Sequence, residues 1–443
     1  MFRRILIANR GEIAVRIIRA CREKDITSIA VHSEPDRNSL HVFLADESIC
    51  IGPAPLDQSY LNMPGLIAAA EACDADAIHP GYGFLAENTK FAGICRDCNI
   101  AFIGPTTNAL KLSGDKAACR EIADNAGVPI IDGSADVVHT PEEARAIADD
   151  VGFPVLVKAA SGGGGKGMRI AHNDAALSGA FTLAANEAAI AFGDPRVYIE
   201  RFVENARHIE FQIIADEHGA CVALGERECT IQRRHQKLIE EAPAPTLDDD
   251  LRNTMADAAL RVARAMGYTN AGTAEFLLTT DERFYFIEFN ARIQVEHPVT
   301  EEVTGLDLIR EQIRVAAGEP LGYADAPIQG HAIEARVYAE DPERDFAPCA
   351  GTINRCHIPG GPGIRVDTDL FAGCKVMPDY DPLLAKVIAR GHDRDQAIRR
   401  LGGALDEVIT EGVCNTAGLC ARIIRGDRFG RGELSGDIIE EYI

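Results

Sequence analysis

The first 112 residues alternate short apolar runs with amphipathic stretches, a pattern typical of a parallel sheet covered by helices. Residues 5–8 and 28–32 are apolar runs of strand length, and residues 12–23 between them have helical spacing. This order predicts a parallel, doubly wound α/β unit. Residues 9–12 contain one glycine where a dinucleotide fingerprint requires G-x-G-x-x-G, so the sequence does not support NAD binding.

In the central region, two aromatic-rich runs flank the polar turn 279–282 and predict a β-hairpin. We expect Leu278 to pair with Arg283, because this register closes the hairpin over that turn. Glu275 would then lie opposite Phe286, on the strand that the second run forms.

On that register, three side chains with oxygen donors share one face of the hairpin: Glu275, Glu288 and Asn290. Glu275 and Glu288 would be diagonal neighbours, roughly 7–8 Å apart at their backbones, a gap that long side chains can close. Carboxylate and amide oxygens are ligands that Mg²⁺ accepts beside water and phosphate oxygens. The hairpin therefore predicts a metal site. The alternative is a solvated polar strand face, because charged side chains are mostly exposed.

A glycine-rich segment, residues 161–168, follows the apolar run 154–157. Glycines allow backbone amides to approach phosphates, and Lys158 and Lys166 add positive charge. Gly167 stands where a P-loop requires Ser or Thr, so a Walker-type site is excluded. A flexible linker is the alternative. The strand before the glycines and the apolar residues after them favour a hairpin lid over phosphates.

Composition narrows the class of protein. The chain has 443 residues, 46% hydrophobic and 26% charged, which fits a globular protein of two or three domains. A net charge of −23 argues against nucleic acid or an anionic membrane as a partner. The 13 cysteines lack paired spacing, and no apolar run reaches membrane-spanning length, so we expect a cytoplasmic protein. Cys95 and Cys98 form a single C-x-x-C, which favours helix-core thiols over a metal or redox site.

Four further segments carry weaker signals. Residues 79–84 form a glycine-containing loop that could approach a ligand, although a simple turn explains it equally well. Residues 232–237 are a basic run in an acidic protein, and either an anion site or a solvated face would account for it. Residues 331–338 alternate like a strand, and residues 359–363 are rich in Gly and Pro, which predicts a sharp turn.

Taken together, these motifs resemble those of the biotin carboxylase family, the ATP-grasp component of biotin-dependent carboxylases. The resemblance covers essentially the whole chain and rests on four segments in the family's order, residues 7–14, 79–85, 233–243 and 292–301. Any one segment alone would be a weak signal, but the ordered set is highly specific.

The resemblance implies an α/β fold with three domains. These are a Rossmann-like N-terminal domain at 1–112, an ATP-grasp domain at 113–318 and a mixed α+β C-terminal domain at 331–438. Within the ATP-grasp domain, a mobile glycine-rich lid is expected at about 130–203.

The resemblance also implies roles for individual residues. The implied ATP contacts are Lys116, Lys158, Gly164, Gly165, Glu200, Arg201, Val203, His208, Gln232, His235, Leu277, Glu275 and Glu288. The implied ligands of Mg²⁺ or Mn²⁺ are Glu275, Glu288 and Asn290, in agreement with the hairpin pattern. The implied bicarbonate site comprises Lys237, Arg292, Gln294 and Val295, and the implied biotin contacts are Arg336, Tyr82 and Gly83. The implied catalytic group is Arg292, Glu296, Lys237 and Arg336.

In the implied reaction, Glu296 takes the bicarbonate proton so that the oxyanion attacks the γ-phosphate of ATP and gives carboxyphosphate. Arg336 would stabilise the enolate-like biotin that then forms, and lid closure would exclude water from the labile intermediate. The alternative role for Glu296 is structural, as an ion-pair partner of Arg292 that holds its loop.

None of the six methionines is followed by lysine, so the chain lacks the Met-Lys-Met site at which biotin is attached. We therefore expect biotin on a separate biotin carboxyl carrier protein, and we expect a separate carboxyltransferase subunit. The subunit contact of the family implies a homodimer. The final acceptor, whether acetyl-CoA, pyruvate or another acyl compound, stays open.

Two other functions are less favoured. A ligase that joins a carboxylate to an amine is disfavoured by residues 292–297 and Arg336, which serve bicarbonate and biotin in the family. A catalytically silent nucleotide-binding scaffold would be expected to lack a metal ligand or the base, and all of these are present.

Overall fold

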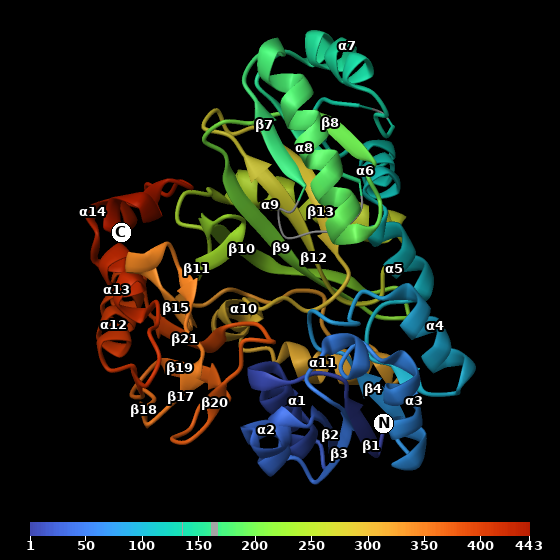
Figure 1. Cartoon of the computed structure of the whole chain (residues 1–443), viewed down its shortest axis with the longest axis vertical. Coiled ribbons are helices and arrows are strands. Elements are labelled where there is room, and N and C mark those ends of the chain that lie inside the picture. Colours follow the sequence, from blue (N-terminus) through green and yellow to red (C-terminus); the bar gives the residue numbers. More distant parts are fainter. Residues whose placement is uncertain (135, 161–166) are drawn as a thin grey trace.

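A computed structural model of the chain describes residues 1–134, 136–160 and 167–443. The N-terminal part, at the bottom of Figure 1, is a parallel five-stranded sheet in the order β3-β2-β1-β4-β5. Its strands are β1 (Arg4–Ile7), β2 (Thr27–Ser33), β3 (Glu47–Gly52), β4 (Ala77–His79) and β5 (Ala101–Phe102). Its helices are α1 (Gly11–Glu23), α2 (Leu40–Leu44), α3 (Met63–Ala72) and α4 (Thr89–Asp97).

Successive residues of β1 enter different cores, as expected for a strand that is buried on both faces. Ile5 packs with Ile13 of α1, whereas Leu6 packs in a second cluster with Leu66 of α3. The doubly wound α/β prediction is therefore confirmed. Cys95 lies fully buried in the second cluster as a free thiol, which confirms the helix-core interpretation.

The centre of the molecule is an antiparallel eight-stranded sheet in the order β13-β12-β9-β10-β11-β14-β21-β19. Its strands are β9 (Arg207–Ala215), β10 (Cys221–Arg233), β11 (Gln236–Ala242), β12 (Asn270–Leu278), β13 (Phe284–Asn290), β14 (His331–Tyr338), β19 (Ile364–Thr368) and β21 (Leu383–Gly391). The pairing of β11 with β14 joins the central and C-terminal regions in one sheet. Side chains from both regions can therefore meet on one surface.

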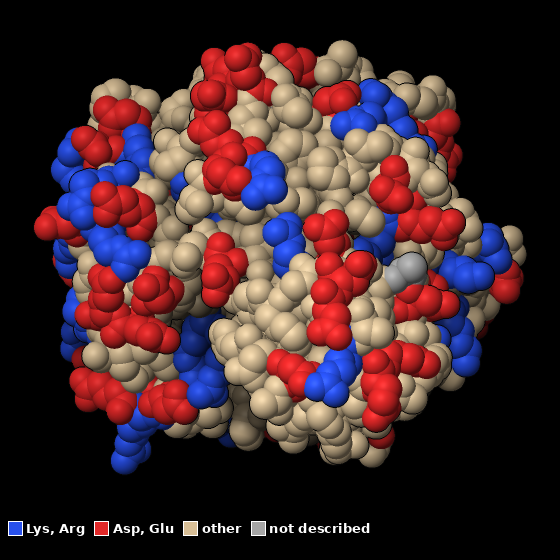
Figure 2. Space-filling view, turned by 90° about the horizontal axis from the view of Figure 1, so that it is seen from above, with Lys and Arg blue, Asp and Glu red and all other residues tan. Residues whose placement is uncertain are grey.

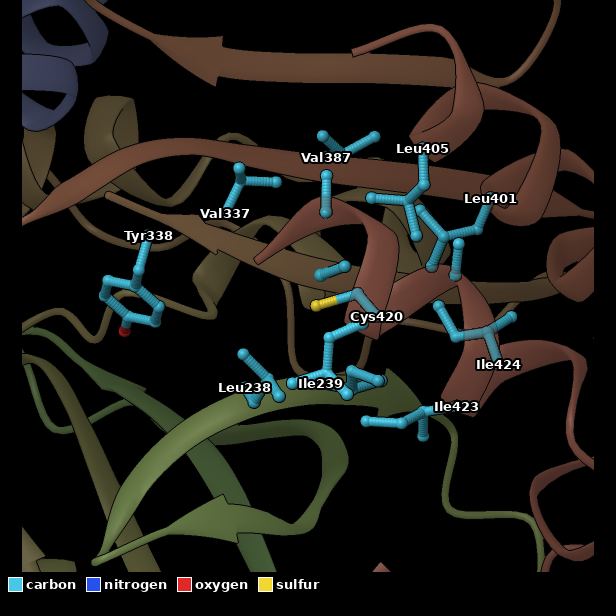
Figure 3. Packing of buried hydrophobic residues seen from close by; sticks show 14 of the residues in the cluster. Leu238, Ile239, Val337, Tyr338, Val387, Leu401, Leu405, Cys420, Ile423 and Ile424 are labelled. Carbon is cyan, nitrogen blue, oxygen red and sulfur yellow. The ribbon is translucent and has the colours of Figure 1, made fainter. Parts of the chain in front are cut away.

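Helices cover this sheet and complete its cores. The helices of the central region are α5 (Thr107–Gly114), α6 (Lys116–Asn125), α9 (Asp249–Ala265), α10 (His297–Thr304) and α11 (Leu308–Ala316). The C-terminal helices are α12 (Arg394–Asp406), α13 (Ala417–Arg425) and α14 (Asp427–Gly430). Figure 3 shows the C-terminal core, in which strands β11, β14 and β21 pack against helices α12 and α13. The labelled side chains there include Leu238, Ile239, Val337, Val387, Leu401, Leu405, Cys420, Ile423 and Ile424.

The C-terminal part also contains short strand pairs beside its helices, which confirms its mixed α+β character. They are β15 (Glu340–Asp341) with β16 (Ala347–Pro348), β17 (Gly351–Thr352) with β20 (Lys375–Val376), and β18 (Arg355–His357) with β22 (Ile409–Glu411). The Gly/Pro-rich stretch 359–363 lies between β18 and β19, as the sequence predicts.

A separate three-stranded sheet lies at the top of Figure 1, and we call it the lid sheet. It consists of β6 (Val155–Ala159), β7 (Met168–Ala171) and β8 (Val197–Arg201), packed with α7 (Pro141–Val151) and α8 (Asp174–Phe192) around its own apolar cluster. Lys158 of β6 pairs with Met168 of β7, which confirms the hairpin predicted around the glycines. Gly164 and Gly165 lie outside the described residues.

The turn of the β12–β13 hairpin differs from the predicted one. Leu278 pairs with Phe284, not with Arg283. The reason is that the hairpin closes between Thr279 and Arg283. The Thr279 N–H donates to the Arg283 carbonyl (2.8 Å), and the Arg283 N–H donates to Thr279 Oγ1 (3.1 Å). Glu282 takes up a left-handed conformation within the turn (φ 61°), as three-residue hairpin loops require.

A β-bulge then shifts the register again. Ile287 is the extra residue, because Phe276 pairs with Phe286 while Glu275 pairs with Glu288. The prediction that Glu275 lies opposite Phe286 is therefore wrong. The two carboxylate residues are direct rather than diagonal cross-strand neighbours.

Acidic and basic side chains are interspersed on the face shown in Figure 2. None of the helices in the described part of the chain is both long and apolar enough to cross a bilayer.

Candidate active site

Three carboxylates converge on Lys237 of β11. Its Nζ lies 2.5 Å from Glu210 Oε2, 2.6 Å from Glu296 Oε1 and 3.3 Å from Glu275 Oε1. The carboxylates come from β9, from the segment before α10 and from β12, so adjacent strands of the central sheet assemble the group. Burial disfavours the charged ammonium, but the three carboxylates raise the pKa of Lys237 well above its usual value.

Glu296 bridges two cations. Its Oε2 lies 2.8 Å from Arg336 Nη2, while its Oε1 contacts Lys237. Arg336, on β14, also lies 2.6 Å from Glu240 Oε1. Burial opposes ionisation of Glu296, but the charges of Lys237 and Arg336 outweigh it and lower its pKa. Glu296 is therefore an ionised, buried carboxylate at neutral pH.

Arg292 makes its ion pair elsewhere. Its Nε donates to Glu87 Oε2 (3.0 Å), and its Nη2 donates to Asn290 Oδ1 (3.3 Å). Since the ion-pair partners of Glu296 are Lys237 and Arg336, the alternative in which Glu296 holds its loop by pairing with Arg292 is wrong.

The amide side chains of this segment fix Glu275. Gln294 Nε2 and Asn290 Nδ2 both donate to Glu275 Oε1, at 2.7 and 2.8 Å. The main chain of the neighbouring Val295 is held as well, because Lys386 Nζ donates to its carbonyl (2.9 Å). The structure thus brings Lys237, Gln294, Glu296 and Arg336 into one buried network, with Arg292 linked to it through Asn290.

The sequence reasoning missed Arg227, the largest of the fully buried side chains. From β10, its Nε lies 2.6 Å from Glu210 Oε1, and its Nη2 donates to Gln294 Oε1 (3.1 Å). Further bonds run to Gln212, Thr273 and Thr300. The available signal was a run of three consecutive charged residues, Glu226, Arg227 and Glu228, in the middle of a long strand.

The basic run between β10 and β11 divides between two roles. Arg233 and Arg234 reach Asp345 on the surface, at 3.1 and 3.0 Å. Lys237 instead turns into the carboxylate group, which favours the anion-site interpretation for that residue. A solvated face fits Arg234, whereas Arg233 is mostly covered and its guanidinium lies 3.8 Å from the centre of the Phe346 ring.

A candidate metal site adjoins Lys237. Glu275 and Asn290 are in contact, and Glu288 lies opposite Glu275 on β13, so the three predicted ligands share one part of the hairpin. Carboxylate and amide oxygens fit a hard cation such as Mg²⁺. His208 Nε2 lies 3.1 Å from Glu275 Oε2 and 3.6 Å from Glu210 Oε2. Burial disfavours the charged imidazole, but the carboxylates raise its pKa to about 9, so His208 serves them as a cation.

A group of basic side chains lies on the lid sheet and on α6. Lys158 of β6 lies 3.5 Å from Glu200 Oε2, and Arg120 lies 2.8 Å from the other oxygen of that carboxylate. Burial and the nearby Lys158 charge lower the pKa of Lys116, at the start of α6. An anion such as a phosphate would relieve this repulsion.

The other predicted nucleotide contacts lie on or beside strands β8, β10, β11 and β12. Arg201 donates to the Tyr285 hydroxyl (3.2 Å), and Tyr285 pairs with Leu277 across the hairpin. Burial and the charge of His208 lower the pKa of His235. The two remaining residues are Gln232, which donates to the Cys229 carbonyl (2.7 Å), and Val203, which follows β8.

The loop 79–84 reaches the site through Lys386. Tyr82 donates a hydrogen bond to the Glu12 carboxylate, which in turn lies 3.0 Å from Lys386 Nζ. Lys386 is also bonded to the Val295 carbonyl. Gly83 has a positive φ (69°), and a Cβ there would meet nothing within 4 Å, so its backbone faces open space.

Comparison with known proteins decides the family. Residues 1–110 and 334–441 match the families described as "Biotin carboxylase, N-terminal domain" and "Biotin carboxylase C-terminal domain". Residues 115–324 match "Carbamoyl-phosphate synthase L chain, ATP binding domain". A biotin carboxylase of Nostoc sp. is 52% identical over 99% of both chains. The chain belongs to the biotin carboxylase family. The family and the ligase class expected from the sequence are thereby confirmed.

Two further relatives are informative. A biotin carboxylase of Pseudomonas aeruginosa is 48% identical over 100% of this chain and 99% of its own. The biotin carboxylase domain dimer of Hydrogenobacter thermophilus 2-oxoglutarate carboxylase, solved with MgADP, ADP and bicarbonate, is 45% identical with a TM-score of 0.97. It covers 100% of this chain and 98% of its own. The three-part α/β fold is thus confirmed.

Proposed function

We propose that this protein carboxylates biotin carried on a separate chain, using ATP and bicarbonate, with carboxyphosphate as the intermediate. The observation that carries the proposal is the ionised Glu296, buried between Lys237 and Arg336. A buried carboxylate between two cations can accept a proton where an anionic substrate would bind.

Bicarbonate binding would use Lys237, Arg292, Gln294 and the main chain at Val295. Glu296 then removes its proton, and the resulting oxyanion attacks the γ-phosphate of ATP. Phosphate is held by Lys116 and Lys158, whose mutual repulsion favours an anion between them. The remaining nucleotide contacts that we propose are Gly164, Gly165, Glu200, Arg201, Val203, His208, Gln232, His235 and Leu277.

Mg²⁺ or Mn²⁺, when bound, supplies positive charge to the phosphates. Glu275, Glu288 and Asn290 are the residues that would hold it, because they offer adjacent hard oxygen donors. The lysines and the arginine network of this chain position the other reactants.

Biotin would enter beside Arg336, whose guanidinium is directed at Glu296 and can stabilise a negative ureido oxygen. Tyr82 and Gly83 would contact it from the N-terminal loop, where the backbone at Gly83 is open. The location of Arg336 on β14 and of the bicarbonate residues before α10 supports transfer of the carboxyl group over a short distance.

We propose the domain boundaries 1–112, 113–318 and 331–438, with a lid at about 130–203 that closes over ATP. We also propose a cytoplasmic homodimer that acts with a biotin carboxyl carrier protein and a carboxyltransferase subunit. The dimer is supported by the Hydrogenobacter relative, which was solved as a domain dimer.

The test is incorporation of labelled bicarbonate into free biotin. Purified protein with ATP, Mg²⁺, labelled bicarbonate and biotin should yield acid-labile carboxybiotin together with ADP. Omission of any one substrate should abolish the labelled product. ADP release that is indifferent to both bicarbonate and biotin would contradict the proposed function.

A further inference from the structure

Two cysteines remote from the active-site network meet on the C-terminal part of the molecule. Cys349 follows β16 and is half-buried, and Cys414 follows β22 and is exposed. Both are free thiols. The two side chains lie close enough to interact, and the influence of Cys349 raises the pKa of Cys414.

The backbone brings the two segments together independently of the thiols. The Asn354 N–H donates to the Glu411 carbonyl (2.7 Å). A Cβ added at Gly351 would lie 2.9 Å from the Gly412 carbonyl oxygen and 3.1 Å from Val413 Cγ1. From Asn354 back to Gly351, the contacted residue moves forward from Glu411 to Gly412 and Val413, so the two segments run antiparallel. Gly412 in turn packs against the Thr352 carbonyl, so the chain that leads back to Cys349 runs beside the chain that leads on to Cys414.

Both segments are anchored to the end of the strand that carries Arg336. The Cys349 N–H donates to the Ala339 carbonyl (2.8 Å), and the Thr416 N–H donates to the Tyr338 carbonyl (3.1 Å). Thr416 Oγ1 donates to the Arg336 carbonyl (3.2 Å) and accepts from the Tyr338 N–H (2.9 Å). Figure 3 shows Tyr338 at the edge of the C-terminal core. The two cysteines therefore lie on neighbouring segments that the end of the same strand holds in place.

We propose that Cys349 and Cys414 are a reversible oxidation site, at which a peroxide oxidises the two thiols to an intramolecular disulfide. Cys414 is the exposed thiol, so its ionised fraction, although reduced by the raised pKa, is the one that attacks a peroxide oxygen: an S–O bond forms, the O–O bond breaks, and the leaving hydroxide takes up a proton to become water. Cys349 then attacks this sulfenic sulfur: the S–S bond forms, the S–O bond breaks, and a second water leaves. Two thiols are oxidised and one hydrogen peroxide is reduced.

The disulfide would join two segments that are far apart in the chain. A crosslink that closes such a loop restricts the unfolded chain, so the oxidised protein should have the higher melting temperature. It would also link covalently the two segments that hydrogen-bond to Tyr338 and Ala339, which follow Arg336 closely in the sequence.

The test treats the full-length protein with hydrogen peroxide, blocks remaining thiols with an alkylating agent under denaturing conditions, and maps peptides by mass without reduction. We expect a peptide pair joined through Cys349 and Cys414, two hydrogens lighter than the sum of its thiol forms and separated by dithiothreitol. The melting temperature should rise on oxidation and fall back on reduction.

Conservative variants provide the controls. Cys414→Ser and Cys349→Ser should each lose both the joined peptide and the rise in melting temperature. Cys50→Ser should keep both, because Cys50 is an exposed thiol whose contact is the Gly52 carbonyl. Recovery of both cysteines as alkylated or singly oxidised peptides, or a crosslink found only between two molecules, would overturn the proposal.

Discussion

Replacing Arg227 with methionine should lower the free energy of unfolding by about 3–5 kcal/mol, the usual cost of breaking a fully buried ion pair. Arg227 has no exposed side-chain surface, and its Nε lies 2.6 Å from Glu210 Oε1. Methionine preserves much of the volume but none of the charge. Lys237 still lies 2.5 Å from the other oxygen of Glu210, so the carboxylate is not left wholly uncompensated. This favours the lower end of the range.

The same substitution should disturb the bicarbonate site, because Gln294 loses the donor that holds its Oε1 at 3.1 Å. We expect a higher KM for bicarbonate and a KM for ATP close to that of the unmodified protein. Denaturant unfolding at neutral pH and steady-state kinetics on one preparation measure both effects. The matched control is Arg283→Met: its ion pair with Asp281 is largely exposed, so its loss should lower the free energy of unfolding far less than the loss of the buried pair. Equal stability losses in the two variants would refute the reasoning.

Two further predictions concern Glu240 and Arg336. Burial raises the pKa of Glu240 from 4.5 to about 7 despite Arg336, so the folded protein keeps a proton that the unfolded chain releases. This stabilisation is complete below about pH 4.5 and is lost as the pH rises through 7, a change of up to about 3 kcal/mol. Melting temperatures of Glu240→Gln should therefore fall less between pH 5 and 7 than those of the unmodified protein; parallel curves would contradict this. Arg336→Ala should lose biotin carboxylation but keep part of the bicarbonate-dependent ATP hydrolysis measured without biotin; equal loss of both would place Arg336 in phosphoryl transfer or in a structural role.

Hydrophobic patterning predicts the middle of the N-terminal sheet well, because β1 and β2 are compact apolar runs. Ile5 and Leu6 enter different cores, and the sequence needs only apolar residues on both faces to specify this. The lid hairpin is also predictable, since β6 and β7 flank the glycines directly. Long-range charge pairing is not visible in this way.

The hairpin register shows why site geometry is harder to predict. A turn closed by Thr279 and a bulge at Ile287 each shift the pairing, and neither leaves a mark in the apolar pattern. Arg227 and Lys386 were missed for a related reason. Each is a fully buried charge with partners from distant parts of the chain, such as Gln294 for Arg227 and the Val295 carbonyl for Lys386. Local sequence shows only a charge within a strand.

The most direct test of the account is Glu296→Gln, which preserves the shape of the side chain but cannot accept a proton at neutral pH. Bicarbonate-dependent ATP turnover should fall about 10²- to 10⁴-fold, the usual contribution of a general base. Nucleotide affinity, measured on the same preparation, should stay close to that of the unmodified protein, because other residues hold ATP. The melting temperature should fall only modestly, because Lys237 keeps Glu210 and Arg336 keeps Glu240 as ion-pair partners. Turnover near that of the unmodified protein would remove Glu296 from the mechanism. A large fall in melting temperature together with loss of ATP binding would show instead that Glu296 serves mainly to neutralise Lys237 and Arg336.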